Sequence, residues 1–139
     1  GRERAFVGEH YDNRNRLTTN AVARLIHSIA GGVAVSAARS QTMLNLMQRS
    51  VPSDPPAPGE EDQVTGFLGA GFPPGTALYS KAGYTSQVRH DAVYFELPSG
   101  IPGLLVAFTE GREHSRNRDI LPQLARLIAQ TMATDEPLT

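Results

Sequence analysis

The sequence has no cysteine, only one lysine and no long apolar run. The lack of cysteine excludes disulfides and thiolate metal sites, but it leaves the cellular compartment undecided. No stretch approaches the roughly 18 apolar residues of a transmembrane helix, and the first residues lack the apolar segment of a signal peptide. They also lack an initiating methionine, which is compatible with a processed or trimmed N-terminus. An export signal before residue 1 therefore stays possible.

The chain also has little net charge. Its 14 acidic and 13 basic side chains leave a formal charge of −1, and charged residues make up 19% of the sequence. No block of basic residues is present to follow a phosphate backbone, so we expect no nucleic-acid partner. A 40% apolar fraction over 139 residues is typical of one globular domain with one core.

Two helices are predicted in the first half of the chain, after a loop over residues 1–17. Apolar residues at helical spacing, with a threonine cap at position 18 or 19 and Gly31-Gly32 as a stop, predict a helix over about 19–30. Ser36 is the candidate cap of a second helix that ends before Pro52. Both helices lie within residues 18–51. Residues 52–75 combine prolines with acids and are predicted to form an exposed loop.

The second half predicts a sheet covered by a helix. Three strands, at about 77–86, 91–98 and 103–110 within residues 76–111, are joined by short connections, which favour an antiparallel meander. A long amphipathic helix over 115–133 should lie across this sheet, with Pro122 in its first turn and Asp119 as a possible cap. The predicted fold class is therefore α+β: an antiparallel sheet with N-terminal helices and a C-terminal helix packed on it.

The single lysine, Lys81, stands in the stretch Lys-Ala-Gly-Tyr-Thr-Ser, whereas every other basic residue is arginine. A compact ammonium can relay a proton or hold an anion as a point charge. Gly83 would let a substrate approach the backbone, and the Tyr84 N–H would then face the bound group. The alternative is a solvent-exposed lysine on a strand edge, where it prevents aggregation. Spacing alone favours this alternative.

The stretch from Lys81 to Ser86, followed by Val-Arg-His-Asp-Ala and an apolar strand, resembles the Lys-Thr-Gly strand and its successor in class A β-lactamase-like serine hydrolases and penicillin-binding proteins. Three further segments resemble the same proteins in the same order: residues 15–19, 72–76 and 108–111. The resemblance covers roughly residues 13–133. It corresponds to the C-terminal half of a β-lactamase/transpeptidase-like fold, so the chain is expected to be a single C-terminal fragment of that domain.

The resemblance implies a serine hydrolase that acts through an acyl-enzyme on a β-lactam, an amide or an ester. It assigns Lys81 to substrate placement and proton transfer, and the Tyr84 backbone N–H to the oxyanion. Glu9 falls where class A enzymes keep a water-activating glutamate, although an ordinary loop carboxylate is the alternative. No cofactor and no metal site are expected, because the four histidines lack the spacing of metal ligands.

Substrate binding is implied for Gly83, Thr85, Ser86 and Arg89. Arg89 resembles in its placement the arginine that anchors a substrate carboxylate in class A enzymes, and an ordinary strand-end arginine is the alternative. Ala82 departs from the family, which has threonine or serine there, so the hydroxyl that would bond a substrate carboxylate is missing. Thr85 or Ser86 would have to replace it.

The nucleophile of the family is absent, because Leu78 stands where Ser-x-x-Lys would need a serine before the only lysine. Tyr11-Asp12-Asn13 and Ser115-Arg116-Asn117 match the loose form of a second family motif, and chance explains both. The resemblance therefore implies that a missing N-terminal half, or a second copy, completes the sheet along residues 103–110.

The alternative is a non-catalytic binding or assembly module that keeps the scaffold. A third possibility is an esterase of the same fold that spares β-lactams. The implied partners of a hydrolase are a small acyl substrate and the completing polypeptide, with no membrane span. The resemblance alone implies a periplasmic or secreted location in a bacterium.

Overall fold

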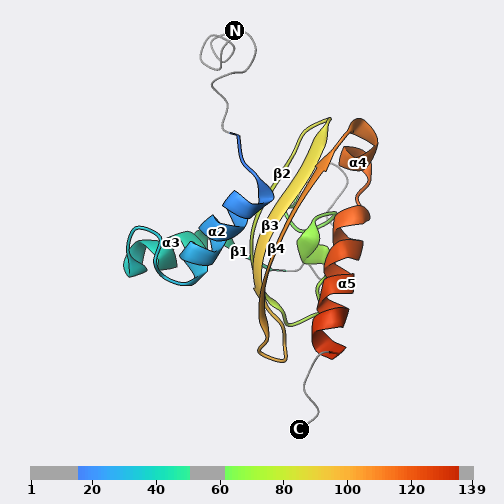
Figure 1. Cartoon of the computed structure of the whole chain (residues 1–139). Helices are drawn as coiled ribbons and strands as arrows, with labels where there is room; N and C mark the ends of the chain where they lie inside the picture. Colours follow the sequence, from blue (N-terminus) through green and yellow to red (C-terminus); the bar gives the residue numbers. More distant parts are fainter. Residues whose placement is uncertain (1–15, 51–61, 135–139) are drawn as a thin grey trace, which may run out of the picture.

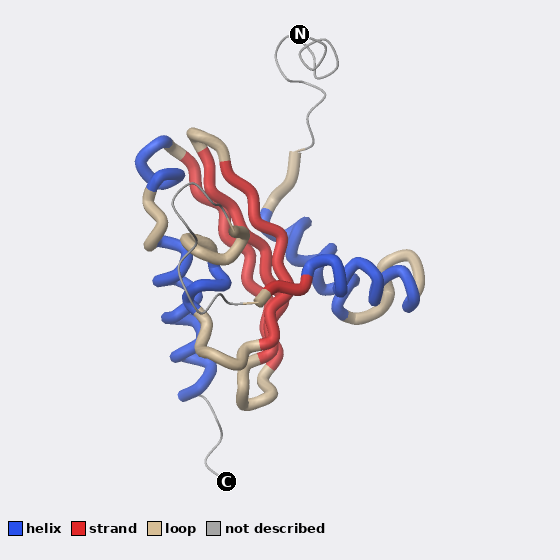
Figure 2. The backbone as a smooth tube through the Cα atoms, turned by 180° about the vertical axis from the view of Figure 1, so that it is seen from behind, coloured by secondary structure: helices blue, strands red, loops and turns tan. Residues whose placement is uncertain are grey.

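The structure, a computed structural model, describes residues 16–50 and 62–134. Within these residues an antiparallel sheet has α2 and α3 on one face and α5 on the other (Figures 1 and 2). The predicted α+β class is confirmed. The elements in chain order are α2 (Thr19–Ala30), α3 (Ala37–Met47), β1 (Gln48–Arg49), the 3-10 helix η1 (Leu68–Gly71), β2 (Ala77–Tyr84), β3 (Val88–Glu96), β4 (Pro102–Glu110), α4 (Arg112–Arg116) and α5 (Ile120–Thr134).

The sheet has the strand order β1-β2-β3-β4, and every neighbouring pair is antiparallel. The prediction of three strands was therefore short by one in the described part of the chain. The missed strand, β1, has two residues, too few to show the alternation by which a strand is recognised. At the other side of the sheet, β4 pairs with β3 only, as far as the described residues extend.

The hairpin between β2 and β3 is tighter than the sequence suggested. Thr85 N donates to Val88 O (2.8 Å), and the Thr85 hydroxyl accepts the N–H groups of Gln87 (3.2 Å) and Val88 (3.3 Å). Because this one side chain holds the turn closed, β3 begins at Val88 rather than at the predicted residue 91. The loop between β3 and β4, residues 97–101, is instead one residue longer than predicted, because β3 ends at Glu96 and β4 begins at Pro102.

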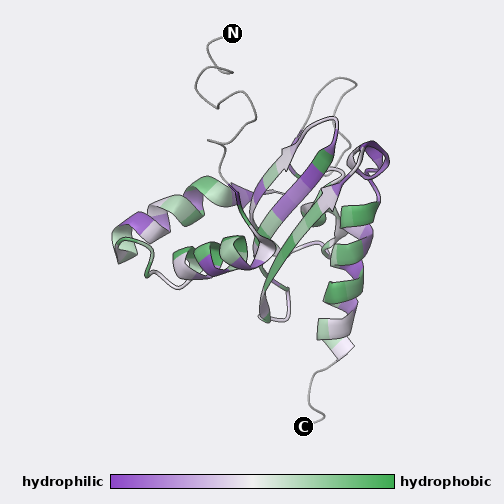
Figure 3. Cartoon of the chain, turned by 45° about the horizontal axis from the view of Figure 1, so that its top comes forward, coloured by the Kyte–Doolittle hydropathy of each residue, from purple (hydrophilic) through white to green (hydrophobic). Residues whose placement is uncertain are grey.

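Two apolar clusters hold the layers together. Between the sheet and the η1–α5 side, Leu78, Val93 and Phe95 pack with residues such as Leu121. On the other face, Ile26 and Ile29 of α2 pack with Ala92, and Met43 and Met47 of α3 pack against them. The green colour of much of β4 in Figure 3 reflects its run of apolar residues, which touch both clusters.

The helix boundaries follow their caps. The Thr18 hydroxyl accepts the Ala21 N–H (3.1 Å) at the start of α2, and the Ser36 hydroxyl accepts the Arg39 N–H (3.3 Å) at the start of α3. Both helices and both caps were predicted, and they are confirmed. No helix in residues 16–50 or 62–134 has the length and apolar character needed to cross a membrane.

The single C-terminal helix predicted over 115–133 is in fact two helices. α4 ends at Arg116, and α5 starts at Ile120 after a short break. In the break the Asn117 side-chain oxygen accepts the Asp119 N–H (2.9 Å), a local bond that competes with helical hydrogen bonding. Pro122 is the third residue of α5 and so lies in its first turn, as expected.

Candidate active site

The backbone of β2 points the Tyr84 N–H away from β3. Thr85 N donates to Val88 O, so the Thr85 amide points toward β3. Successive residues of a strand point their N–H groups in opposite directions, and the Tyr84 amide therefore points to the outer side of β2. On that side the described strand β1 pairs only with Leu78 and Tyr79, at the far end of β2.

A small pocket of about 180 Å³ lies along this outer edge, and we call it the β2-edge pocket. It is formed where the strand meets the loop that leads into η1. The loop contributes one aromatic ring and two polar side chains, and the end of β2 contributes the rest of the lining. Its lining residues are Asp62, Gln63, Phe67, Ala82, Gly83 and Tyr84.

Lys81 lies next to this pocket but on the other face of the strand. Its side chain is exposed, and its ammonium donates a hydrogen bond to the backbone carbonyl of Ala82. The Ala82 carbonyl points to the outer edge of β2 for the same reason as the Tyr84 amide, so the ammonium bends toward that edge. This exposure also fits the simpler interpretation of an edge lysine, and the catalytic role of Lys81 stays a prediction.

Gly83 leaves open space above the strand. A Cβ atom added at this position would have no other atom within 4 Å. The approach of a ligand to the backbone that the sequence predicted at Gly83 is therefore sterically available.

Arg89 is buried, with 6% of its surface exposed, and is held by backbone carbonyls. Its Nε donates to Ser115 O (2.9 Å), and its Nη1 donates to Gly66 O (3.4 Å). The guanidinium carbon lies 4.6 Å from the centroid of the Phe67 ring and 4.9 Å from that of Tyr84, which are cation–π distances. Arg89 thus supports the two aromatic walls of the β2-edge pocket from behind.

The remaining predicted residues lie in the hairpin turn or outside the described chain. The Thr85 hydroxyl closes the turn, and the Ser86 carbonyl accepts the Ser115 hydroxyl (2.9 Å). Neither residue lines the β2-edge pocket. Glu9 lies outside the described residues, as does Tyr11-Asp12-Asn13. Within residues 16–50 and 62–134, acids and histidines do not gather into groups that could hold a metal ion.

Sequence reasoning missed Asp91, which is almost fully buried beside the predicted site. Its carboxylate accepts the N–H groups of Leu68 (3.0 Å) and Ala92 (2.9 Å). Burial raises the pKa of Asp91 to about 7, although both hydrogen bonds and the charges of Lys81 and Arg49 act in the opposite direction. An acid at the start of the apolar run Ala-Val-Tyr-Phe is the signal that could have indicated it.

Sequence reasoning also missed Asp62 and Phe67, which were assigned to an exposed loop. They meet β2 only in the folded chain, where both line the β2-edge pocket. No local pattern in the sequence indicated this contact.

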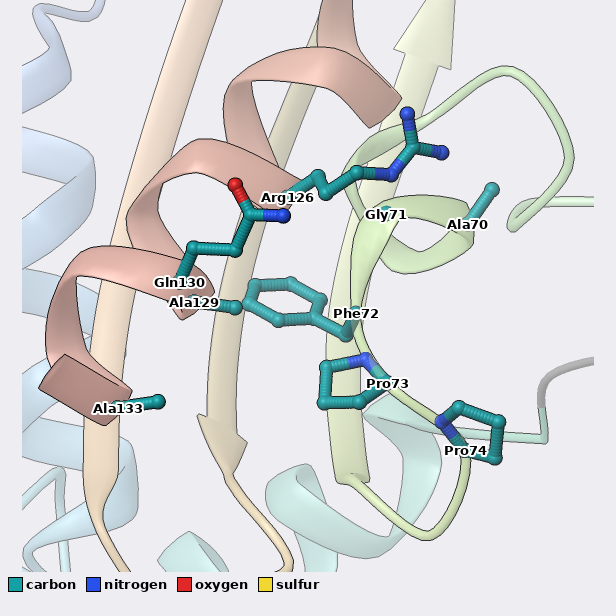
Figure 4. Close-up of a pocket in the computed structure, with 9 residues that line it drawn as sticks. All are labelled: Ala70, Gly71, Phe72, Pro73, Pro74, Arg126, Ala129, Gln130 and Ala133. Carbon is teal, nitrogen blue, oxygen red and sulfur yellow. The ribbon is translucent and has the colours of Figure 1, made fainter.

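A second pocket, of about 420 Å³, lies between α5 and the segment that follows η1 (Figure 4). The Phe72 ring projects toward Ala129 at its centre, and Arg126 and Gln130 extend from α5. None of the site residues predicted from the sequence lines it.

The family model described as the β-lactamase enzyme family matches residues 2–132. The chain belongs to the β-lactamase enzyme family. The resemblance read from the lysine strand is thereby confirmed. No curated protein sequence matches the chain.

Solved structures of β-lactamases and of PBP-A share the fold. A β-lactamase from Chitinophaga pinensis superposes with a TM-score of 0.70 at 19% identity, over 95% of this chain and 48% of that chain. PBP-A gives a TM-score of 0.67 at 21% identity, over 88% of this chain and 42% of its own. A mutant of the last common ancestor of Gram-negative class A β-lactamases gives a TM-score of 0.66 at 18% identity, over 90% of this chain and 44% of that chain. The chain therefore spans less than half the length of each of these relatives.

Proposed function

We propose that this chain supplies the lysine-strand wall of the acyl-transfer site in a serine hydrolase of the β-lactamase type. In this proposal the nucleophilic serine, in a Ser-x-x-Lys motif, comes from polypeptide outside residues 1–139. The observation that carries the proposal is the direction of the Tyr84 N–H, which points to the outer edge of β2 beside a pocket and next to the only lysine.

The proposed chemistry is acyl transfer in two steps. The serine oxygen attacks the carbonyl carbon of the substrate, and the negative charge that develops on the carbonyl oxygen is stabilised by the Tyr84 N–H and a second donor. The tetrahedral intermediate then expels the leaving group, and water later hydrolyses the acyl-enzyme. Lys81 assists by placing a positive charge at the edge where the substrate lies. A mutant of PBP-A, which shares the fold, has been solved as an acyl-enzyme complex with penicillin G.

We further propose that the completing polypeptide pairs with β4. Gly111 N donates to Gln87 O and Leu97 N donates to Ile101 O, so the odd-numbered residues of β4 exchange hydrogen bonds with β3. The amides of the even-numbered residues, including Val106, consequently point to the other side of β4. An apolar strand with such an edge pairs with another chain or segment. A periplasmic or secreted location is proposed from the resemblance alone, and cell fractionation tests it.

A second candidate function is a non-catalytic binding or assembly module. Ala82 favours it, because a site for substrate carboxylates would need a hydroxyl at this position, and so does the absence of Ser-x-x-Lys from the 139 residues. The sequence of the parent reading frame separates the two: a Ser-x-x-Lys upstream favours the enzyme. A small-ester hydrolase that spares β-lactams is the third candidate.

The test is an assay of the whole protein with nitrocefin and p-nitrophenyl acetate, together with mass spectrometry of the protein after reaction. We expect turnover of one or both substrates and a mass increase equal to the acyl group. Lys81→Ala should lower kcat/KM by about 100-fold or more without lowering the melting temperature, because the side chain is exposed.

Arg112→Ala, which removes another exposed cation, is the matched control and should leave turnover unchanged. Turnover of the ester alone would identify the small-ester hydrolase. A whole protein that turns over neither substrate and gains no mass would be the non-catalytic module instead.

A further inference from the structure

We propose that the β2-edge pocket takes a neutral or cationic group and disfavours a carboxylate, so that the substrates are esters or amides without a carboxylate beside the scissile bond. This inference rests on the proposed function, which puts the scissile carbonyl at the Tyr84 N–H. Three observations carry it. A carboxylate lines the pocket, the nearby cations already donate hydrogen bonds to other groups of the chain, and Ala82 lacks the hydroxyl that would bind a carboxylate.

The charge on the pocket wall belongs to Asp62. Its Oδ1 accepts the N–H groups of Val64 (2.6 Å) and Thr65, and its Oδ2 accepts the Thr65 hydroxyl (2.6 Å). Partial burial raises the pKa of Asp62, but these bonds and the charge of Arg118 outweigh it and lower the pKa below the ordinary 3.8. The carboxylate is therefore ionised at neutral pH and fixed in place by its own loop.

Three arginines of the described residues, Arg49, Arg89 and Arg118, lie near the pocket, and each donates hydrogen bonds to neighbouring groups of the chain. Arg89 donates from Nε and Nη1 to the carbonyls of Ser115 and Gly66, and it lies behind the rings of Phe67 and Tyr84. Arg118 donates to Thr65 O (3.2 Å). None of these arginines lines the pocket, whereas Asp62 does. Among the described residues that line the pocket, the charged side chain is therefore the Asp62 carboxylate, which repels a ligand carboxylate.

The lysine next to the pocket also donates its hydrogen bond to a backbone carbonyl. The Lys81 ammonium donates to the Ala82 carbonyl and is not among the groups that line the pocket. It contributes positive charge at the edge of the strand without presenting a donor inside the pocket.

The polar groups that do line the pocket suit a neutral or cationic ligand. Ala82 has no hydroxyl to donate to a ligand. The side-chain oxygen of Gln63 accepts a hydrogen bond from Arg49 Nη2 (2.9 Å), so the NH₂ group of Gln63 is its polar group that remains for a ligand. The Phe67 and Tyr84 rings already carry the Arg89 guanidinium, so they contribute apolar walls to the pocket. With the Gln63 amide and the Asp62 carboxylate, they form a site for an uncharged amide or a protonated amine.

A binding experiment tests the preference without requiring turnover. The ¹⁵N-labelled whole protein is titrated with 3-phenylpropylamine, 3-phenylpropanamide and 3-phenylpropionate, and the backbone amide signals of Phe67, Ala82 and Tyr84 are followed. We expect the amine and the amide to shift these signals with dissociation constants at least about tenfold lower than that of the acid. Tighter or equal binding of the acid, or no shift with any of the three, would overturn the proposal.

Two variants connect the preference to the charge. Asp62→Asn keeps an oxygen to accept the Val64 and Thr65 N–H groups while it removes the charge, and it should abolish the preference. Glu96→Gln is the control. It removes an exposed carboxylate at the end of β3 that lies far from Tyr84, and the preference should persist in this variant. A preference that survives in Asp62→Asn would also overturn the proposal.

If the whole protein forms an acyl-enzyme, a second measurement applies to the reaction itself. Phenylacetyl esters of glycolate, glycolamide and choline share an acyl group and differ in the charge of the leaving side. We expect kcat/KM for the choline and glycolamide esters to exceed that of the glycolate ester by about tenfold or more. Failure to form any acyl-enzyme refutes the proposed function only, because the titration is read without turnover. A glycolate ester cleaved best refutes the inference only.

Discussion

The carboxylate of Asp91 accepts a 3.0 Å hydrogen bond from the backbone N–H of Leu68, which lies 23 residues earlier in the chain. Both residues are almost completely buried. The bond ties β3 to the first residue of η1, and the residue before it, Phe67, forms a wall of the β2-edge pocket. A buried carboxyl group thus positions one wall of the candidate active site.

We predict that the burial of this carboxyl group makes folding stability depend on pH. Burial raises the pKa of Asp91 from 3.8 to about 7, so the folded chain holds the proton more tightly than the unfolded chain does. The stabilisation is therefore complete below about pH 4 and is lost as the pH rises through about 7, up to roughly 4 kcal/mol in total.

The measurement is urea unfolding of the wild type and of Asp91→Asn between pH 5 and pH 8. The stability of the variant should rise relative to the wild type as the pH increases, because its side chain has no proton to lose. Asp119→Asn, at an exposed acid, serves as the control and should follow the wild-type curve. Parallel curves for Asp91→Asn and the wild type would contradict the prediction.

Two buried serines should respond in opposite directions to removal of the hydroxyl. Within the described residues the Ser80 hydroxyl has no hydrogen-bond partner, whereas the Ser115 hydroxyl donates to Ser86 O (2.9 Å). Ser80→Ala removes an unsatisfied polar group and should stabilise the fold by about 1 kcal/mol, while Ser115→Ala should destabilise it by a similar amount. Chemical denaturation measures both, and equal losses in the two variants would show that Ser80 is satisfied.

The parts of the fold that the sequence predicted well are those fixed by local signals. The helix over 19–30 was predicted with correct bounds, because Thr18 and Gly31 act on their own neighbours. The hairpin turn was predicted too long, because its closure depends on one side chain, Thr85, bonding to two backbone amides. The break between α4 and α5 likewise depends on a single bond from Asn117, which the apolar spacing around it does not show.

The site was predictable only on the strand that carries the family motif. Lys81, Gly83 and Tyr84 were found from their order in one short stretch, and their catalytic and binding roles stay predictions. Asp62 and Phe67 were not found, because they come to β2 from a loop that the sequence pattern marks only as exposed. Their positions are set by long-range packing of η1, which no local pattern indicates.

Two glycines should tolerate an added methyl group very differently. A Cβ at Gly71 would lie 2.1 Å from the Pro122 carbonyl oxygen and 2.8 Å from the Ala125 Cβ, whereas one at Gly83 would meet nothing within 4 Å. Gly71→Ala should therefore destabilise the fold by about 2 kcal/mol or more, because η1 and α5 must move apart. Gly83→Ala should leave stability within about 0.5 kcal/mol of the wild type.

The same two variants separate folding from function. Gly83→Ala should reduce turnover by the whole protein, because its methyl group occupies the approach to the β2 backbone. Unfolding experiments and the nitrocefin and ester assays, run on both variants, check this. Full activity in Gly83→Ala would show that no substrate passes over this glycine.

The last prediction concerns the edge of β4 and uses two adjacent residues with amides that point in opposite directions. The Leu105 amide points toward β3, and the Val106 amide points to the other side of β4. Proline removes a backbone N–H, so Leu105→Pro should break the β3–β4 ladder and unfold the chain. Val106→Pro should keep the helical and strand content, but it should prevent a completing segment or a second copy from pairing with β4.

Circular dichroism and light scattering of the 139-residue chain and both variants measure these two effects separately. We expect the wild type to associate, because an apolar strand edge recruits a partner strand. Val106→Pro should then shift the mass toward the monomer without loss of structure, while Leu105→Pro should lose structure. A wild type that stays a monodisperse monomer, or a Val106→Pro variant that associates as the wild type does, would mean that β4 is not the edge along which the fold is completed.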